Sequence, residues 1–125
     1  MADPTLLVID DSADFRTLLA DHLSDAGFNV MTAPDGRDGL KQIDAGGVDL
    51  AIVDLMMPNV NGYEVAQELR WREEGERPPF ILISAYDLGR WSAEQLGAVA
   101  GFGKPLDFIA LETTVREVLE ARAAA

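Results

Sequence analysis

Cysteine is absent from this sequence of 125 residues. Its absence excludes disulfide bonds, thiolate metal sites and cysteine nucleophiles together, and it fits a reducing compartment. The sequence also has no apolar run of about 18 residues, the length that a membrane-spanning helix needs. The N-terminal segment has no basic start followed by an apolar core, so it does not resemble a signal peptide. These absences predict a cytoplasmic protein, and Met1 directly before a short leader favours a natural start.

Basic residues are scarce as well. The chain has 10 Lys and Arg against 22 Asp and Glu, which gives a formal net charge of −12. Such a chain repels phosphate groups, so nucleic acids and anionic membranes are poor direct partners. The one histidine, His22, lies in a segment of mixed polarity. We predict a surface or boundary position for it and no phosphorelay role.

Apolar residues are plentiful, at 48%, and the length fits one domain spanning residues 1–125, structured from about residue 4 to residue 121. Apolar runs typical of strands alternate with segments of helical periodicity. Ser12 is a plausible cap for the first helix, and Gly27 a plausible stop. The predicted strands cover residues 5–10, 28–33, 48–54, 78–84 and 100–105, and the predicted helices cover residues 11–27, 35–47, 59–75, 88–99 and 106–125.

Five repetitions of strand and helix predict an α/β fold, with a parallel sheet covered by helices on both faces. The continuously apolar segments "LLVI", "LAIV" and "FILI" agree, because parallel strands are buried on both sides. The sequence contains no internal repeat, linker or low-complexity segment.

Polar side chains end four of the five predicted strands. Asp10 and Asp11 end the first strand, Asp54 the third, Ser84 the fourth and Lys104 the fifth. Ligands of open parallel α/β sheets bind beyond the carboxyl ends of the strands. We therefore expect these five side chains to form one cluster at one edge of the sheet.

This cluster has the chemistry of a phosphoryl-transfer site. Three neighbouring carboxylates repel one another and raise one another's pKa, and a hard divalent cation such as Mg²⁺ would relieve that repulsion. The side chains of Asp10 and Asp11 diverge, so one would bind the metal directly and the other through water. A carboxylate, a metal, a lysine and a hydroxyl together can stabilise a phosphoryl group during transfer.

Four motifs resemble those of the receiver domain of bacterial response regulators, over essentially the whole chain. They are "VIDDSADFR", "DLMMPNVNG", "ISA" and "KPL", in the family's order and approximate spacing. The resemblance implies a flavodoxin-like (βα)₅ sandwich with a five-stranded parallel sheet of order 2-1-3-4-5. It also implies phosphorylation of Asp54 by a histidine kinase or phosphotransfer protein, within a two-component system or phosphorelay.

The resemblance further implies a ligand set for Mg²⁺. The metal would be held by Asp10 or Asp11, by Asp54 and by the backbone carbonyl of Met56. The chain would not be an enzyme in the usual sense, because it would transfer the phosphoryl group only to its own Asp54 and lose it slowly.

The resemblance also implies a switch. A cis peptide bond before Pro105 would aim Lys104 at the phosphoryl group, and Ser84 would donate a hydrogen bond to that group. The movement of Ser84 would change the surface of the fourth helix, fifth strand and fifth helix. A downstream protein or a fused output domain would read this change.

The sequence departs from the family pattern on the fifth strand. The family usually has an aromatic residue three positions before the lysine, where this chain has Gly101 followed by Phe102. Either Phe102 points into the core and takes the switch role, or the aromatic switch is absent. The segment from Ser84 to Lys104 is also about two residues short, so we expect a short or distorted fourth helix.

Two further departures concern the lifetime of the phosphoryl group. Met56 and Tyr86 stand where family members often have polar residues that position the attacking water. An apolar and a bulky side chain would shield the acylphosphate, so we predict slow self-dephosphorylation.

Four aromatic side chains are left with less specific roles. Trp91 and Phe108 line a partner surface or pack between helices, and Phe15 belongs to the core or to a kinase-docking surface together with Leu19. Trp71 is predicted to be half-exposed at a helix end.

Two rival functions come from other classes. A hydrolase with an aspartyl nucleophile would want a second acid two residues after Asp54, where this chain has Met56. A pseudo-receiver that acts only as an interaction module typically loses the phosphoacceptor, an acid of the pair or the lysine, and all of these are present. The chain is either a stand-alone regulator or a receiver excised from a larger protein. The sequence does not identify the kinase, the input signal, the output or the oligomeric state.

Overall fold

The structure, a computed structural model, describes residues 3–55, 62–72, 77–84 and 93–124. The predictions for Met56, Tyr86 and Trp91 concern residues outside these ranges, as does the first half of the predicted fourth helix. Within that segment, residues 93–95 are helical.

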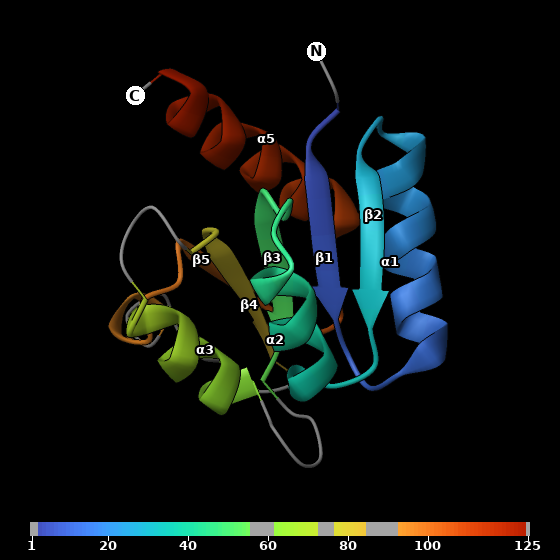
Figure 1. The fold of residues 1–125 in the computed structure, drawn as a ribbon. Coiled ribbons are helices and arrows are strands. Elements are labelled where there is room, and N and C mark those ends of the chain that lie inside the picture. The colour runs from blue at the N-terminus through green and yellow to red at the C-terminus, as the bar shows by residue number, and fades with distance from the viewer. Residues whose placement is uncertain (1–2, 56–61, 73–76, 85–92, 125) are drawn as a thin grey trace.

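A five-stranded parallel sheet forms the centre of the molecule (Figure 1). Its strands lie in the order β2-β1-β3-β4-β5, so the predicted fold class and strand order are confirmed. The parallel register places Ile9 beside Val53, Asp54 beside Ile83 and Ser84 beside Gly103. The strands are β1 (Thr5–Ile9), β2 (Asn29–Ala33), β3 (Leu50–Asp54), β4 (Phe80–Ser84) and β5 (Ala100–Gly103).

Side chains alternate between the two faces of each strand, so the sheet is covered by two apolar cores. The helices are α1 (Ala13–Asp25), α2 (Gly36–Asp44), α3 (Gly62–Arg70) and α5 (Phe108–Ala124). The α2/α3 core contains Leu7, Ile9, Ile43, Val53, Val65, Leu69, Phe80 and Leu82, and the α1/α5 core contains Leu6, Val8, Leu19, Leu23, Ile52, Ile83, Leu111 and Val115.

Helix α1 (Ala13–Asp25) lies within the predicted range 11–27 and has the predicted cap and stop. The Ser12 side chain accepts a hydrogen bond from the backbone N–H of Phe15, at 3.2 Å. Such a cap satisfies one of the N–H groups that the first turn of a helix leaves without a partner. The chain leaves the helix through Gly27, whose φ of 102° suits glycine. The cap and the stop fix the direction in which α1 leaves the end of β1.

The start of α3 is packed tightly against the end of β3. A Cβ atom added to Gly62 would collide with the backbone carbonyl oxygen of Asp54 and with the Cα of Leu55. Only glycine allows this approach. The contact holds the strand end that carries Asp54 against the first turn of α3.

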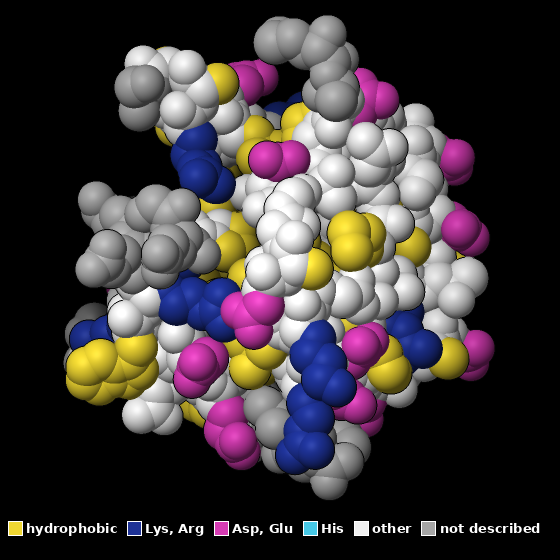
Figure 2. All heavy atoms as spheres, in the orientation of Figure 1, with side chains coloured by type: hydrophobic (Ala, Val, Ile, Leu, Met, Phe, Trp, Pro, Cys, Tyr) yellow, Lys and Arg dark blue, Asp and Glu magenta, His cyan; other side chains and the backbone are white. Residues whose placement is uncertain are grey.

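The surface is acidic, in keeping with the composition. In the view of Figure 2, acidic side chains are spread over the whole face and do not gather in one patch. None of the helices among the described residues is long and apolar enough to cross a membrane.

Candidate functional site

Three carboxylates meet at the carboxyl edge of the sheet. Asp10 and Asp11 follow β1, and Asp54 is the last residue of β3. Each offers an oxygen atom that lies within 4.8 Å of the other two. Asp10 and Asp54 are only 1% and 3% exposed, whereas Asp11 is exposed. The parallel topology thus brings together the acidic residues that the sequence places at two strand ends.

The carboxylate of Asp10 has one satisfied oxygen and one without a hydrogen bond. Its Oδ1 accepts a hydrogen bond from the backbone N–H of Ser12 at 2.9 Å. Its Oδ2 is buried and accepts no hydrogen bond from any described residue. The Arg16 guanidinium donates to the Asp10 backbone carbonyl at 2.7 Å and holds the chain in place. A buried carboxylate oxygen without a donor is costly and calls for a cation.

Burial raises the pKa of Asp10 to about 6. The Ser12 N–H and the Lys104 ammonium favour the charged form and oppose this rise, whereas the nearby charges of Asp54 and Asp11 add to it. The ionised form of Asp10 is therefore poorly stabilised by the protein alone.

Lys104 brings a positive charge to the cluster from the end of β5. Its Nζ lies 3.4 Å from Asp54 Oδ2 and 3.5 Å from Asp10 Oδ2. Both distances exceed the 2.7–2.9 Å or so of a strong charge-assisted hydrogen bond. The ammonium is thus shared between two carboxylates, and neither holds it by a short hydrogen bond. The peptide bond between Lys104 and Pro105 is cis, as the resemblance implies.

Ser84 ends β4 and is 2% exposed. Its backbone carbonyl accepts a hydrogen bond from the Lys104 N–H at 2.9 Å, which ties the ends of β4 and β5 together. Alternation along β4 directs its side chain toward the side of the α2/α3 core. Ser84 therefore lies on the strand next to that of Asp54, at the same carboxyl edge of the sheet.

Phe102 and Gly101 face opposite sides of the sheet. Phe102 pairs with Ile83 and packs against the α1/α5 core. Gly101 faces the other side, where an added Cβ would lie 2.9 Å from the Cβ of Ala93. Phe102 thus points into the core, but on the face opposite to Ser84. A switch role for Phe102 stays a prediction, and it would have to run through the α1/α5 core.

The three carboxylates fit a hard divalent cation. All the donor atoms are carboxylate oxygens, the ligand type that Mg²⁺ prefers. Asp10 also has a buried oxygen, Oδ2, that lacks a hydrogen bond among the described residues. Asp10, Asp11 and Asp54 would hold the ion. The predicted fourth ligand, the carbonyl of Met56, lies outside the described residues.

Sequence reasoning missed the contacts that surround Lys104 on its other side. The Phe15 ring lies under the ammonium group, with 4.6 Å between Nζ and the ring centroid. Phe15 meets Phe108 edge to face, at 6.2 Å between centroids. The spacing of Phe15 predicted a core or docking side chain, and nothing in the sequence indicated which cation it would meet.

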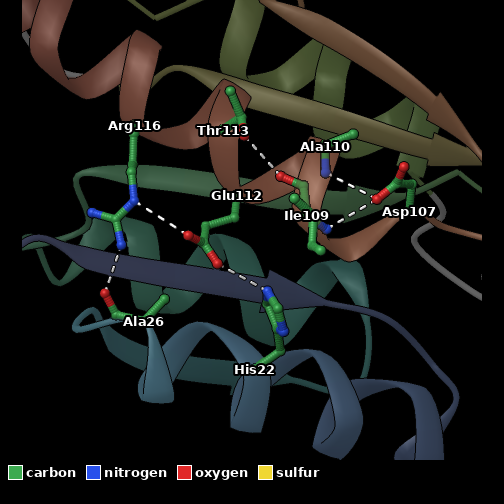
Figure 3. A network of polar contacts seen from close by, with 8 residues as sticks. All are labelled: His22, Ala26, Asp107, Ile109, Ala110, Glu112, Thr113 and Arg116. Atoms are coloured by element: carbon green, nitrogen blue, oxygen red, sulfur yellow. Dashed lines mark hydrogen bonds and ion pairs between the residues drawn. The ribbon is translucent and has the colours of Figure 1, made fainter.

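An ion pair between α1 and α5 was missed as well (Figure 3). His22 Nε2 lies 3.0 Å from Glu112 Oε1, and Arg116 contacts the other oxygen of Glu112 at 3.4 Å. Arg116 also donates to the backbone carbonyl of Ala26, at 2.7 Å. His22 is half-buried, in agreement with the surface or boundary position predicted for it.

Two predictions for aromatic side chains have clear outcomes. Phe108 packs against the α1/α5 core, so it lies between helices as one of the two alternatives had it. Trp71 follows α3 and is 80% exposed, which is more than the half-exposure predicted. The reason is that α3 ends at Arg70, so Trp71 lies beyond the helix.

Comparison with known proteins agrees with the geometry. Residues 6–116 match the family model described as the response regulator receiver domain. The chain is 38% identical to the probable transcriptional regulator ycf27 of Porphyridium aerugineum, over 95% of this chain and 49% of that protein. It thus spans about half the length of the curated relatives it matches.

Solved structures with the same fold include two with appreciable sequence identity. The chemotaxis protein CheY4 of Vibrio cholerae is 28% identical, with a TM-score of 0.82 over 94% of this chain and 99% of that one. The response regulator TrrA of Thermotoga maritima, solved in complex with Mg²⁺-BeF, is 32% identical, with a TM-score of 0.81 over 91% and 97%. The chain belongs to the response regulator receiver domain family, the signalling modules of two-component systems.

Proposed function

We propose that this chain is a phosphorylation-dependent switch whose phosphoacceptor is Asp54. The observation that carries the proposal is the cluster at the sheet edge. Asp54 lies beside two further carboxylates and within 3.4 Å of the Lys104 ammonium. A buried acid in such surroundings combines a nucleophilic oxygen with groups that stabilise a transferred phosphoryl group.

The chemical step is a displacement at phosphorus. An Oδ atom of Asp54 attacks the phosphorus of a phosphohistidine donor, and an O–P bond forms as the N–P bond breaks. The leaving imidazole nitrogen keeps the electron pair and takes a proton from solvent. The protein contributes mainly by positioning the reacting groups and by stabilising charge, which are the main requirements of phosphoryl transfer.

Mg²⁺, held by Asp10, Asp11 and Asp54, would neutralise charge that develops on the phosphoryl oxygens. Lys104 would then move from its place between Asp10 and Asp54 and pair with the phosphoryl group. Ser84, at the end of the neighbouring strand, would donate a hydroxyl hydrogen bond. These two residues would convert the new charge at Asp54 into a movement of β4 and β5.

The readout would be a protein surface, formed by the fourth helix, β5 and α5. A histidine kinase or phosphotransfer protein would supply the phosphoryl group, and a downstream protein or a fused output domain would receive the signal. The curated relatives are about twice as long as this chain, which supports the second alternative. The apolar Met56 and the bulky Tyr86 would give the acylphosphate a long life.

The test is intact-mass measurement after incubation with acetyl phosphate. Wild-type protein should gain the mass of one phosphoryl group only when Mg²⁺ is present, and Asp54→Asn should gain none. Asp21→Asn, which removes an exposed carboxylate of α1, is the matched control and should behave as wild type.

Absence of a mass gain in folded wild-type protein would overturn the proposal. The interaction-only module would then be the better function. Gly101, which leaves the usual position of the switch aromatic without a side chain, is the feature that favours that alternative.

A further inference from the structure

The ammonium of Lys104 has an aromatic neighbour. Its two carboxylate neighbours lie at 3.4 and 3.5 Å, too far to fix the side chain by strong hydrogen bonds. The Phe15 ring lies on another side, 4.6 Å from Nζ to the centroid. A cation over the face of an aromatic ring is attracted by the negative face of the ring. Phe15 is therefore the third group that sets where the ammonium rests.

Phe15 is held in place through both its backbone and its ring. Its backbone N–H donates to the Ser12 hydroxyl that caps α1. Its ring meets the Phe108 ring at an interplanar angle of 82°, an arrangement that aromatic pairs favour. Phe108 in turn contacts the ring of His22, at 5.4 Å between centroids. Phe15 thus presents a ring face to Lys104 while its ring packs against Phe108.

We propose that Phe15 is a positioning residue for Lys104, holding the ammonium by a cation–π contact at the point from which it can reach a phosphoryl group on Asp54. The role of Lys104 in this inference rests on the proposed function, whereas the contact between Lys104 and Phe15 does not. Among the described residues, the printed contacts of the ammonium are the carboxylates of Asp10 and Asp54 and the ring of Phe15. Of these three groups, Phe15 alone offers an attraction that a change of charge on the carboxylates leaves in place.

This contact also gives the site a route to α5. If the ammonium moves toward a phosphoryl group, it moves relative to the Phe15 ring, and Phe15 packs directly on Phe108 at the start of α5. The route lies on the same face as Phe102 and opposite to Gly101, the position that lacks a side chain.

Lysine-selective NMR tests the contact without any phosphoryl donor. Lys41 and Lys104 are the only lysines of the sequence, so protein labelled with ¹³C-lysine has two sets of side-chain signals. Lys41 is exposed on α2 and serves as an internal reference. Protons above a ring face resonate upfield, so the ε-methylene protons of Lys104 should lie upfield of those of Lys41. The difference should vanish in Phe15→Leu and persist in Phe15→Tyr.

Phosphorylation kinetics test the consequence. With acetyl phosphate and Mg²⁺, Phe15→Leu should react about threefold to tenfold more slowly than wild type, because leucine fills space but has no ring face. Phe15→Tyr should restore most of the rate. Phe28→Leu is the matched control: Phe28 lies in the same core under Arg116, at 4.9 Å, and that substitution should leave both the Lys104 signals and the rate unchanged.

The outcomes separate this inference from the proposed function. Coincident Lys104 and Lys41 signals in wild-type protein would overturn the inference, as would an unchanged rate in folded Phe15→Leu. An upfield Lys104 signal in a protein that takes up no phosphoryl group would leave the contact standing and overturn the proposed function instead.

Discussion

Asp10 carries the main electrostatic conflict of the site. Burial opposes its ionisation, and the negative charges of Asp54 and Asp11 add to that opposition. Among the described residues, one backbone N–H and one shared ammonium favour its charged form. A cation bound at the three carboxylates would offset this repulsion. Without the cation, the buried charge of Asp10 lowers the free energy of unfolding.

The pH dependence of stability should report this conflict. Because the folded-state pKa of Asp10 is raised from 3.8 to about 6, the folded protein binds more protons than the unfolded chain between those values. The stabilising effect of protonated Asp10 is therefore complete below the unfolded pKa and is lost as the pH rises through about 6. In Mg²⁺-free buffer above that pH, Asp10→Asn should be more stable than wild type by about 1–2 kcal/mol.

Urea unfolding of the two proteins across this pH range measures the effect. The gap between the variant and wild type should open as the pH rises from 4 to 7 or so. Asp11→Asn, at the exposed neighbour, is the control and should show a much smaller gap. A gap of constant size at all pH values would contradict the assignment to Asp10.

At the scale of single elements, two glycines set how closely helices approach the sheet. Gly62 at the start of α3 lies against the backbone of Asp54 and Leu55, whereas Gly39 in α2 lies against the Ile9 side chain, whose Cγ1 would be 2.8 Å from an added Cβ. A side chain can change its rotamer, but a strand backbone cannot move without its neighbours.

Gly62→Ala should therefore cost more stability than Gly39→Ala. We expect Gly62→Ala to lower the free energy of unfolding by about 2–4 kcal/mol. The loss should be smaller for Gly39→Ala, because alanine has a higher helix propensity than glycine inside α2. Thermal unfolding checks the order of the two variants. Equal losses would show that the backbone of β3 yields as easily as the Ile9 side chain.

Gly62→Ala should also slow phosphorylation, because it displaces the strand end that carries Asp54.

The elements themselves were largely predictable from the sequence, and so was the meeting of their ends. Asp10, Asp54 and Lys104 come together because parallel strands must share one carboxyl edge, a rule that needs no knowledge of side-chain packing. The helix boundaries shifted by a few residues, for example from residue 47 to Asp44 for the end of α2. Predicted boundaries are the part of an element that local sequence specifies least.

Contacts across the α1/α5 core could not be predicted. His22 and Glu112 are 90 residues apart in the sequence, and their ion pair depends on how α1 and α5 cross. The same holds for Phe15 under Lys104. The side of the sheet that Phe102 faces depends on the register of β5 against β4, which sequence periodicity does not give for a strand of four residues. Alternation in so short a strand carries too little signal.

At the scale of the whole molecule, the charge of −12 shapes the response to ions. A chain with so many like charges repels itself in the folded state, so any salt should stabilise it somewhat by screening. A cation bound by Asp10, Asp11 and Asp54 would stabilise it by a different route, because the unfolded chain does not hold these carboxylates together. The two routes can be separated by concentration and by mutation.

Millimolar Mg²⁺ should raise the melting temperature more than NaCl of the same ionic strength. Binding that is specific to the folded state contributes about 2.7 kcal/mol when the free ion is at 100 times its dissociation constant. The extra stabilisation should disappear in Asp54→Asn and persist in Asp21→Asn, where only an exposed charge of α1 is removed. If Mg²⁺ and NaCl had equal effects in wild type, the acidic cluster would not be a specific Mg²⁺ site. A specific effect of Mg²⁺ would instead show that the fold gathers these carboxylates at the cost of their repulsion and that a bound cation offsets this cost.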